Sequence, residues 1–357
     1  MKGLILAGGH GTRLRPLTFS GNKHMIPIAN EPMLFHGLRH FAQAGITDVG
    51  VVLGTIHEGI REAVGDGTQF GLRVRYIHQG DPRGLADAVL CAWDYLGDDP
   101  FVMYLGDNLI QQGVRPFVDL FNKDAVDAVI GVTPVAHPSQ YGVVELDGGR
   151  IVSIEEKPAA PRSDLALIGV YLFSPAIHPV IERLQPSRRG ELEITDAIRG
   201  LHESRRRVVV QPVSGWWKDT GRPEDLLEAN DLVLRTSPSD FFENLGEVAS
   251  SAQLAGPVRL GRGAYVGEGS RVEGPAVIGE GAHVEEHAEV GAGTAIGDRA
   301  KVVRARVRRS VVMEGALLEG PLDISDSIVG RGAQITRAGS GRMPVKCIVG
   351  DATQVRI

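Results

Sequence analysis

Short apolar runs alternate with stretches of helical spacing along the first third of the chain. Four compact runs predict buried strands: residues 4–6, 49–54, 72–79 and 100–108. Three stretches repeat apolar residues at three- and four-residue steps and predict helices: 32–45, 58–67 and 84–97. Because strands that alternate with helices build a mostly parallel sheet, we expect an α/β, Rossmann-like domain.

The pattern between residues 126 and 220 indicates more strands and fewer helices. Apolar and polar residues alternate over 141–158 around Asp147-Gly148-Gly149, which predicts a hairpin. Further strands are expected at 128–135 and 166–175, a loop running into a helix at 186–204, and a last strand pair at 208–221.

A six-residue repeat of apolar positions begins after residue 256. It is carried by Leu260, Val266, Val272, Ile278, Val284, Val290, Ile296 and Val302, often followed by Gly. This period is typical of a left-handed parallel β-helix. The register shifts after Val302 and resumes at Val312, which predicts a loop or irregular coil near 303–311. We therefore expect an α/β domain at 1–235, a linker at 236–256 and a left-handed β-helix at 257–357.

Composition excludes some functions. The net charge is −6 and the pI about 6.0, which argues against a nucleic-acid or anionic-membrane partner. No apolar run approaches the roughly 18 residues of a membrane span. The only cysteines, Cys91 and Cys347, are far apart, and Met1 leads directly into the first strand without a charged leader. We expect a reduced, cytoplasmic protein.

Two features carry candidate chemistry. Gly8, Gly9 and Gly11 follow the first strand, and Arg13 comes soon after, so this loop either binds phosphate or is a plain strand-to-helix turn. Asp107, at the end of the most apolar strand, is either a helix N-cap or a ligand for Mg²⁺. Asp219, in the string WWKDTG, is a second carboxylate of this kind.

The string GGHGTRLRPLT, followed by Lys23 and then Pro27, resembles the signature of the sugar-phosphate nucleotidylyltransferases. The resemblance covers nearly the whole chain and is strongest for the long form of the glucose-1-phosphate thymidylyltransferases, which have a β-helical tail. It implies a homo-oligomeric enzyme that joins an NTP to a sugar 1-phosphate, releases pyrophosphate and requires Mg²⁺.

The same resemblance assigns roles to residues. The catalytic residues would be Arg13, Lys23, Asp107 and Lys157. The nucleotide would contact Leu6, Gly8, Gly9, Gly11, Thr12, Gln79 and Gly84. The sugar phosphate would contact Tyr141, Gly142, Glu156, Lys157, Gly169 and Glu193. Asp107 and Asp219 would hold the metal. From the residues alone, Glu156 and Lys157 would be an exposed salt bridge, and Glu193 part of a solvated strand face.

Substrate choice is less sharply defined. The strings GLA at 84–86 and GELEITD at 190–196 favour dTTP and glucose 1-phosphate. His24 stands where these enzymes usually have Gln, and its rigid ring predicts relaxed or altered base choice. The alternatives are another sugar or cyclitol phosphate with ATP or GTP in secondary metabolism such as antibiotic biosynthesis, or a non-catalytic regulatory subunit. Acyl transfer by His283 or His287 of the β-helix ranks behind a structural or oligomerising role.

Overall fold

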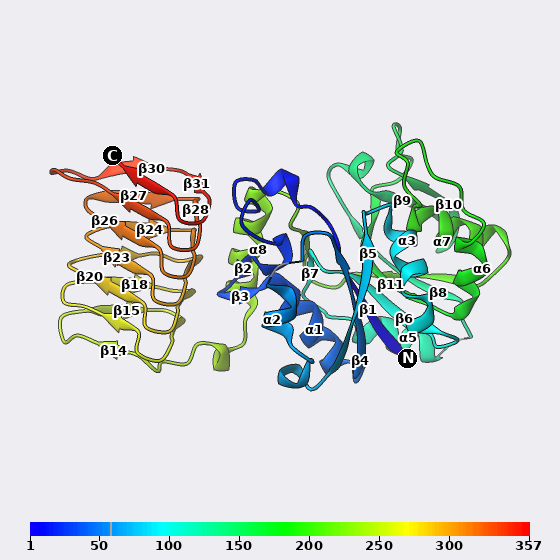
Figure 1. Cartoon of the computed structure of the whole chain (residues 1–357), viewed down its shortest axis with the longest axis horizontal. Helices are drawn as coiled ribbons and strands as arrows, with labels where there is room; N and C mark the ends of the chain where they lie inside the picture. The colour runs from blue at the N-terminus through cyan, green and yellow to red at the C-terminus, as the bar shows by residue number, and fades with distance from the viewer. Residues whose placement is uncertain (58, 124) are drawn as a thin grey trace. The chain divides into compact units, whose positions relative to one another are not determined.

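The computed structural model describes residues 1–57, 59–123 and 125–357 (Figure 1). The chain forms two compact units. The first comprises Met1–His10 and Leu34–Asp219, and the second Gly11–Met33 and Thr220–Ile357. Segment 11–33 thus belongs to the same unit as the C-terminal region. No helix within the described residues is long and apolar enough to cross a membrane.

A nine-stranded mixed sheet forms the centre of the first unit. Its main path runs β10-β9-β11-β6-β1-β4-β5, with β8 beside β11 and β12 beside β8. These strands are β1 (Lys2–Ala7), β4 (Asp48–Gly54), β5 (Arg73–Gly80), β6 (Phe101–Leu105), β8 (Ala128–Pro134), β9 (Gly142–Asp147), β10 (Arg150–Glu156), β11 (Leu165–Phe173) and β12 (Val208–Pro212). Strands β1, β4, β5 and β6 are parallel, so their carboxyl ends share one edge, whereas β11 is antiparallel to β6.

The helices of this unit largely follow the predicted periodicity. They are α1 (Met33–Gln43), α2 (Ile60–Val64), α3 (Leu85–Cys91), α4 (Trp93–Leu96), α5 (Arg115–Lys123), α6 (His178–Ile181) and α7 (Ile194–Glu203). The helix expected at 58–67 is the short α2, and residue 58 itself lies outside the described residues. The helix expected at 84–97 is interrupted at Ala92, which separates α3 from α4.

The hairpin prediction is confirmed, and both strands expected within 208–221 form, but they do not pair with each other. β9 and β10 pair antiparallel, with Asp147 opposite Arg150. β12 pairs with β8, whereas β13 (Trp217–Asp219) pairs with β7 (Asn108–Ile110). The physical reason is that Gln111 and Gln112 form hydrogen bonds with the backbone between β12 and β13. Gln112 Oε1 accepts from Ser214 N at 2.7 Å, and Gln111 N donates to Trp216 O at 3.0 Å.

The second unit contains segment 11–33, helix α8 (Pro223–Thr236) and a parallel β-helix. Segment 11–33 holds the 3₁₀ turns η1 (Thr12–Leu14) and η2 (Lys23–Met25) and the short strands β2 (Pro27–Ile28) and β3 (Glu31–Pro32). Another 3₁₀ turn, η6 (Ser239–Phe241), precedes the β-helix. The expected α/β domain followed by a β-helix is confirmed.

Three stacked parallel sheets make the β-helix. The first contains β14 (Glu247–Val248), β17 (Tyr265–Val266), β20 (His283–Glu285), β23 (Lys301–Val303), β26 (Leu317–Glu319), β29 (Gln334–Thr336) and β32 (Gln354–Arg356). The second contains β15 (Gln253–Ala255), β18 (Arg271–Glu273), β21 (Glu289–Val290), β24 (Arg306–Arg308), β27 (Leu322–Ser325) and β30 (Met343–Val345). The third contains β16 (Val258–Leu260), β19 (Ala276–Ile278), β22 (Thr294–Ile296), β25 (Val311–Val312), β28 (Ile328–Val329) and β31 (Ile348–Val349).

Of the two alternatives expected near 303–311, a loop or an irregular coil, the irregular coil forms. Buried Val307 and Val312 continue the core after Val302, so the coil advances by five-residue instead of six-residue steps. Arg304 and Arg309 adopt φ of 57° and 46° at these shortened corners. Left-handed backbone at the corners lets the strands β24 and β25 stay in register with their neighbours.

Candidate active site

The glycine loop starts where strands β1 and β4 end side by side. A Cβ on Gly54 would overlap the carbonyl oxygen of Gly8, and a Cβ on Gly8 would lie 3.1 Å from Gln79 Oε1. The glycine loop thus packs directly against β4 and the end of β5, and this close packing leaves no room for a side chain at Gly8 or Gly54. The side chain of Leu6 lies in the core at 6% exposure, so any ligand contact of this residue would come from its backbone.

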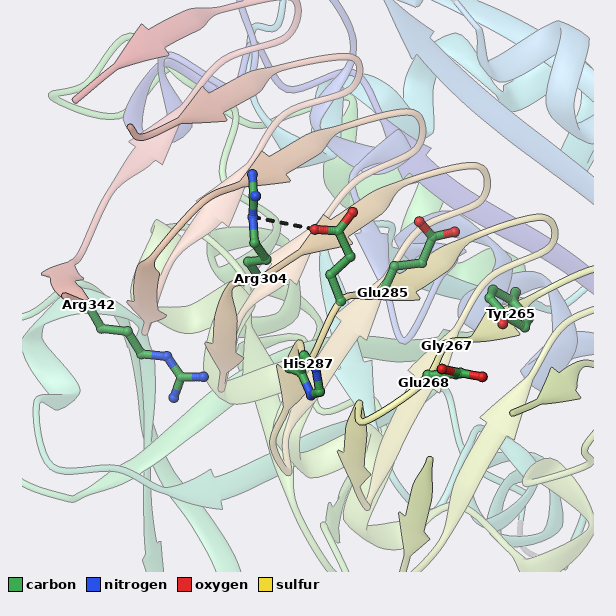
Figure 2. A pocket seen from close by; sticks show the side chains of 8 residues that line it. Tyr265, Gly267, Glu268, Glu285, His287, Arg304 and Arg342 are labelled. Carbon is green, nitrogen blue, oxygen red and sulfur yellow. Dashed lines mark ion pairs between the residues drawn. The ribbon is translucent and has the colours of Figure 1, made fainter. Parts of the chain in front are cut away.

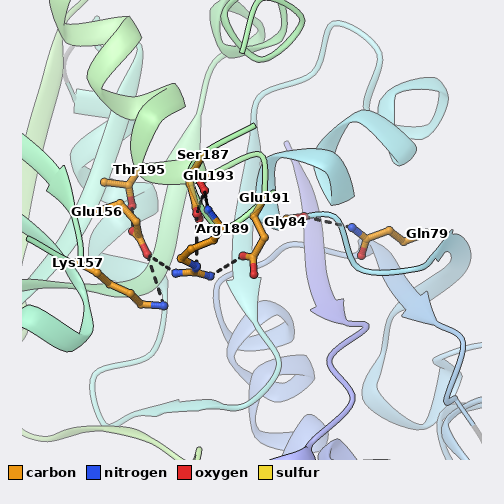
Figure 3. Close-up of polar contacts among 9 residues, drawn as sticks. All are labelled: Gln79, Gly84, Glu156, Lys157, Ser187, Arg189, Glu191, Glu193 and Thr195. Carbon is orange, nitrogen blue, oxygen red and sulfur yellow. Dashed lines mark hydrogen bonds and ion pairs between the residues drawn. The ribbon is translucent and has the colours of Figure 1, made fainter. Parts of the chain in front are cut away.

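The predicted base site is a tight turn that is fixed to a distant loop. Gln79 Nε2 donates to Gly84 O at 3.1 Å and to Asp87 Oδ2 at 2.9 Å, as Figure 3 shows for the first of these bonds. Gly84 has φ of 113°, and a Cβ there would overlap the backbone of Leu192. Leu192 N donates to Arg83 O at 2.8 Å, and Leu192 O accepts from Ala86 N at 3.0 Å. Two backbone hydrogen bonds and close packing therefore hold the turn against the GELEITD loop.

A cluster of charges gathers around Arg189, between β10 and the GELEITD loop (Figure 3). The guanidinium lies 3.2 Å from Glu156 Oε1, 2.6 Å from Glu191 Oε2 and 3.7 Å from Glu193 Oε1. Lys157 Nζ approaches Glu156 Oε1 at 3.6 Å. Two cations therefore lie on either side of one carboxylate, and both are 39–42% exposed, which leaves them accessible to an anionic ligand.

Arg189 is a residue that the sequence interpretation missed. It stands directly before GELEITD in the sequence. That adjacency to a motif rich in carboxylates is the signal that could have identified it.

Glu193 is buried, not part of a solvated strand face. It is 4% exposed and occupies the N-cap position of α7, so the expected strand alternation is wrong here. Ser187 Oγ donates to Glu193 Oε1 at 2.8 Å. Burial raises the pKa of Glu193, and the nearby Glu156 carboxylate adds to the increase. A carboxylate with so few fixed donors retains capacity to accept further hydrogen bonds.

The other predicted sugar-site residues surround this cluster. Lys157 follows β10 with φ of 44°, and its N–H donates to Tyr141 O at 3.0 Å, which joins the two residues. A Cβ on Gly142 would lie 2.7 Å from Thr195 Oγ1. Thr195 in turn donates to Glu156 Oε2 at 2.6 Å. Left-handed backbone at a lysine is a form of local strain that concentrates at functional sites.

Gly169 interrupts the apolar strand β11 near the same group. Its φ is 72°, and a Cβ there would overlap the side chain of Leu105. The preceding carbonyl, of Ile168, accepts from Trp217 Nε1 at 3.0 Å, and the Trp217 ring meets Tyr141 edge-on at 5.5 Å between centroids.

The two predicted metal ligands lie at one end of a two-stranded ladder, Asp219 in β13 and Asp107 in the turn just before β7. Asp219 pairs with Asn108 across the β7–β13 ladder, and Asp107 immediately precedes Asn108. Asn108 Nδ2 donates to Asp107 Oδ1 at 3.1 Å, while its Oδ1 accepts from Trp217 Nε1 at 2.7 Å. The helix N-cap alternative for Asp107 does not apply, because the chain continues into strand β7.

This pair suits Mg²⁺. The described residues contain no group of three or more His, Cys, Asp or Glu side chains that could hold a metal. A metal that takes two protein carboxylates and completes its shell with water and phosphate oxygens needs no such group.

Segment 11–33 presents the remaining predicted nucleotide residues, in the second unit. Gly11 has φ of 64°, and a Cβ there would lie 3.0 Å from the Cβ of Lys23. Thr12 begins the turn η1, which contains Arg13. The Arg13 guanidinium lies so close to Gly221 that a Cβ on that glycine would be 2.9 Å from Nη2. Gly11 and Gly221 therefore give room to the two cations of this segment.

His24 lies inside the protein. It is 1% exposed, and Asn22 Oδ1 receives a hydrogen bond from His24 N at 2.8 Å and lies 2.6 Å from His24 Nδ1. The ring thus shapes the turn that carries Lys23. This burial gives no support to the expectation that the His24 ring alters base choice through its own hydrogen bonds to the nucleotide.

The β-helix has an open pocket of its own, of about 760 Å³ (Figure 2). It is lined by Tyr265, Gly267, Glu268, Glu285, Glu286, His287, Arg304 and Arg342. His283 Nδ1 lies 2.6 Å from Glu285 Oε1, an interaction that stabilises adjacent side chains of β20. The pocket contains no residue of the predicted nucleotidyl-transfer site.

Comparison with known proteins gives the class. Residues 2–236 match the nucleotidyl transferase family. The chain belongs to this family, which confirms the resemblance carried by the glycine loop.

Its similarity to particular members extends through the β-helix. It is 46% identical to the glucose-1-phosphate thymidylyltransferase of Streptomyces griseus, over 100% of this chain and 99% of that protein. The enzyme of the same name from Streptomyces antibioticus is 43% identical over the same shares. A crystal structure of a putative glucose-1-phosphate thymidylyltransferase from Bacillus anthracis in complex with a sucrose has a TM-score of 0.63 at 37% identity, covering 67% of this chain and 96% of that one.

Proposed function

We propose that this protein transfers a thymidylyl group from dTTP to glucose 1-phosphate, giving dTDP-glucose and pyrophosphate. The observation that carries the proposal is the full-length similarity, at 43–46% identity, to two enzymes named for this activity. Arg189, which lies near the buried Glu193 and shares Glu156 with Lys157, supports it, because an anionic sugar needs both phosphate-binding charge and hydroxyl-binding acceptors.

The reaction requires no covalent nucleophile. An oxygen of the sugar phosphate attacks the α-phosphorus in line. A new P–O bond forms as the bond to the bridging β-phosphate oxygen breaks, and pyrophosphate leaves with that electron pair. Catalysis of this kind rests on positioning and on neutralising negative charge.

The residues have the following roles in this proposal. Arg13 and Lys23, with the backbone N–H groups of Gly8, Gly9, Gly11 and Thr12, hold the triphosphate. Gln79 and Gly84 bind the base. Lys157 and Arg189 hold the attacking phosphate, Glu193 accepts from sugar hydroxyls, and Tyr141, Gly142 and Gly169 shape the pocket. Asp107 and Asp219 would hold Mg²⁺, which supplies positive charge to phosphate oxygens.

A panel of substrates tests this function. Pyrophosphate release is measured with Mg²⁺ for dTTP, UTP, CTP, ATP and GTP, each with several sugar 1-phosphates. We expect dTTP with glucose 1-phosphate to give the highest kcat/KM. A much faster rate with another pair would replace this substrate assignment, and no release with any pair would support a non-catalytic subunit.

A further inference from the structure

Segment 11–33 obtains much of its fixed structure from the C-terminal region. Its regular elements are two single 3₁₀ turns and two strands of two residues each. Its internal backbone hydrogen bonds are mostly local three-residue turns, so contacts with other parts of the unit help to fix its conformation. It clusters with α8 and the β-helix in one compact unit.

Two residues on neighbouring coils of the β-helix bind both sides of the turn that carries Lys23. Arg331 Nη2 donates to Met25 O at 2.7 Å. Asp351 Oδ2 accepts from Ser20 Oγ at 2.6 Å. Ser20 and Met25 stand three residues before and two residues after Lys23.

Arg331 and Asp351 also hold each other. Asp351 Oδ1 accepts from Arg331 N at 2.7 Å, and the guanidinium lies 3.9 Å from Asp351 Oδ2. They follow the paired strands β28 and β31, so both stand on the same side of the β-helix. The Asp351 side chain is only 19% exposed, which strengthens its charge-assisted hydrogen bonds.

A second set of contacts fixes the end of the segment. Asn230 of α8 is fully buried, accepts from Ala29 N at 2.9 Å and donates to Gly293 O of the β-helix at 2.9 Å. Asn30 Nδ2 donates to Ile296 O at 2.6 Å. An apolar cluster made by Ala29, Leu234, Val277 and Ala295 packs beside these bonds.

We propose that the β-helix positions the nucleotide-binding segment, and that Arg331 and Asp351 are positioning residues for Lys23. The inference rests on the proposed function, in which Lys23 holds the triphosphate. The β-helix would then contribute to dTTP binding from residues more than 300 positions away in the chain.

The test compares Arg331→Gln and Asp351→Asn with the wild-type protein, in the full chain. Asp323→Asn is the matched control: Asp323 is also 19% exposed and accepts from an arginine, Arg308, at 2.9 Å, but within another sheet of the β-helix. The readouts are KM for dTTP and for glucose 1-phosphate, and hydrogen–deuterium exchange of peptides covering residues 17–33.

We expect both variants to raise KM for dTTP by roughly tenfold, the scale of losing a hydrogen bond to a charged group. KM for glucose 1-phosphate should change little. Exchange in residues 17–33 should increase, and Asp323→Asn should change neither readout. Arg331→Lys, which keeps a cationic donor, should recover part of the dTTP affinity.

Each failure has a separate meaning. Unchanged hydrogen–deuterium exchange in both variants would overturn the proposal that Arg331 and Asp351 hold the segment that carries Lys23. Increased exchange with unchanged KM for dTTP would overturn the link to nucleotide binding. If the wild-type protein did not turn over dTTP, the proposed function would be wrong. Increased exchange in the variants would still support the structural part of the proposal, that Arg331 and Asp351 hold segment 11–33.

Discussion

Asp219 lies opposite Asn108 in the two-stranded ladder of β7 and β13, one residue from Asp107. Asn108 links the two strands, since its amide donates to Asp107 Oδ1 and accepts from the Trp217 indole. Backbone pairing thereby places two aspartates more than 100 positions apart in the chain at the same end of one ladder.

Asp107→Asn is expected to leave the fold intact and to lower kcat at least roughly a hundredfold, the scale of removing one key electrostatic stabiliser. The expected cause is weaker metal and phosphate binding, so added Mg²⁺ should partly restore the rate. Steady-state kinetics over a Mg²⁺ series measures this. Chelation of Mg²⁺ should abolish turnover of the wild-type protein.

Asp147→Asn provides a control for charge removal, because Asp147 is the exposed last residue of β9, next to the turn of the β9–β10 hairpin. It should have wild-type kinetics. Near-normal turnover of Asp107→Asn in ordinary Mg²⁺ would exclude Asp107 from the site.

Gly84→Ala should damage both substrate sites together. A Cβ at this position would lie within 2.6 Å of Leu192 N, and the Leu192 backbone is bonded to the turn at two points. The turn and the GELEITD loop must then separate, so KM for dTTP and for glucose 1-phosphate should both rise.

Gly80→Ala is the matched control for Gly84→Ala. Gly80 also has positive φ, 74°, but a Cβ there would meet nothing within 4 Å. It should lower stability by about 1–2 kcal/mol, the cost of left-handed backbone, with much smaller kinetic changes. If the two variants behaved alike, backbone strain and not the contact with Leu192 would explain the effect.

Arg189→Met should raise KM for glucose 1-phosphate by roughly ten- to a hundredfold, because it removes a charge-assisted contact to the sugar phosphate. KM for dTTP should change little. Arg188→Met is the control: this neighbour is also exposed, yet the Glu156 and Glu191 contacts belong to Arg189. Equal effects of both substitutions would indicate general charge attraction in place of a specific site.

Local pattern and motif were enough to predict the α/β domain, the β9–β10 hairpin and the β-helix. Signals of this kind depend on a few neighbouring residues. The six-residue spacing of Val266 and the apolar residues that follow it predicts the β-helix, and Asp147-Gly148-Gly149 predicts a turn. The order of strands does not follow from such signals. β12 and β13 are neighbours in the chain but join different sheets, because glutamine side chains of a distant loop bind the backbone between them.

The burial of Glu193 and the role of Arg189 depend on the fold as a whole. Alternation with Leu192 and Ile194 suggested a strand, but the helix α7 begins at this point and turns the carboxylate inward. His24 is a similar case, since its neighbours in the sequence gave no sign that the ring would be buried. Contacts of Arg331 with Met25, 306 residues apart, lie wholly outside the reach of local pattern.

Glu193→Gln should separate stability from function. The folded protein holds the pKa of Glu193 above its ordinary value, chiefly through burial and then through Glu156, so an ionised Glu193 costs more free energy in the folded protein than in the unfolded chain. Glutamine removes that cost, keeps the size of the side chain and can still accept from Ser187. We expect unchanged or higher stability at pH 7, with a higher KM for glucose 1-phosphate because a neutral amide is a weaker acceptor for sugar hydroxyls.

The raised pKa of Glu193 also predicts how the stability difference between Glu193→Gln and the wild-type protein changes with pH. Between the ordinary carboxyl pKa and the raised one, the folded state binds more protons than the unfolded state, so the contribution of Glu193 to stability falls as pH rises through that window. The advantage of Glu193→Gln should therefore be largest at neutral pH and shrink as the pH falls toward 4.5. Urea unfolding of both proteins at several pH values measures it. A variant that lost stability at pH 7 and lost still more relative to wild type as pH rose would contradict the assignment, because it would mean that the ionised carboxylate stabilises the fold.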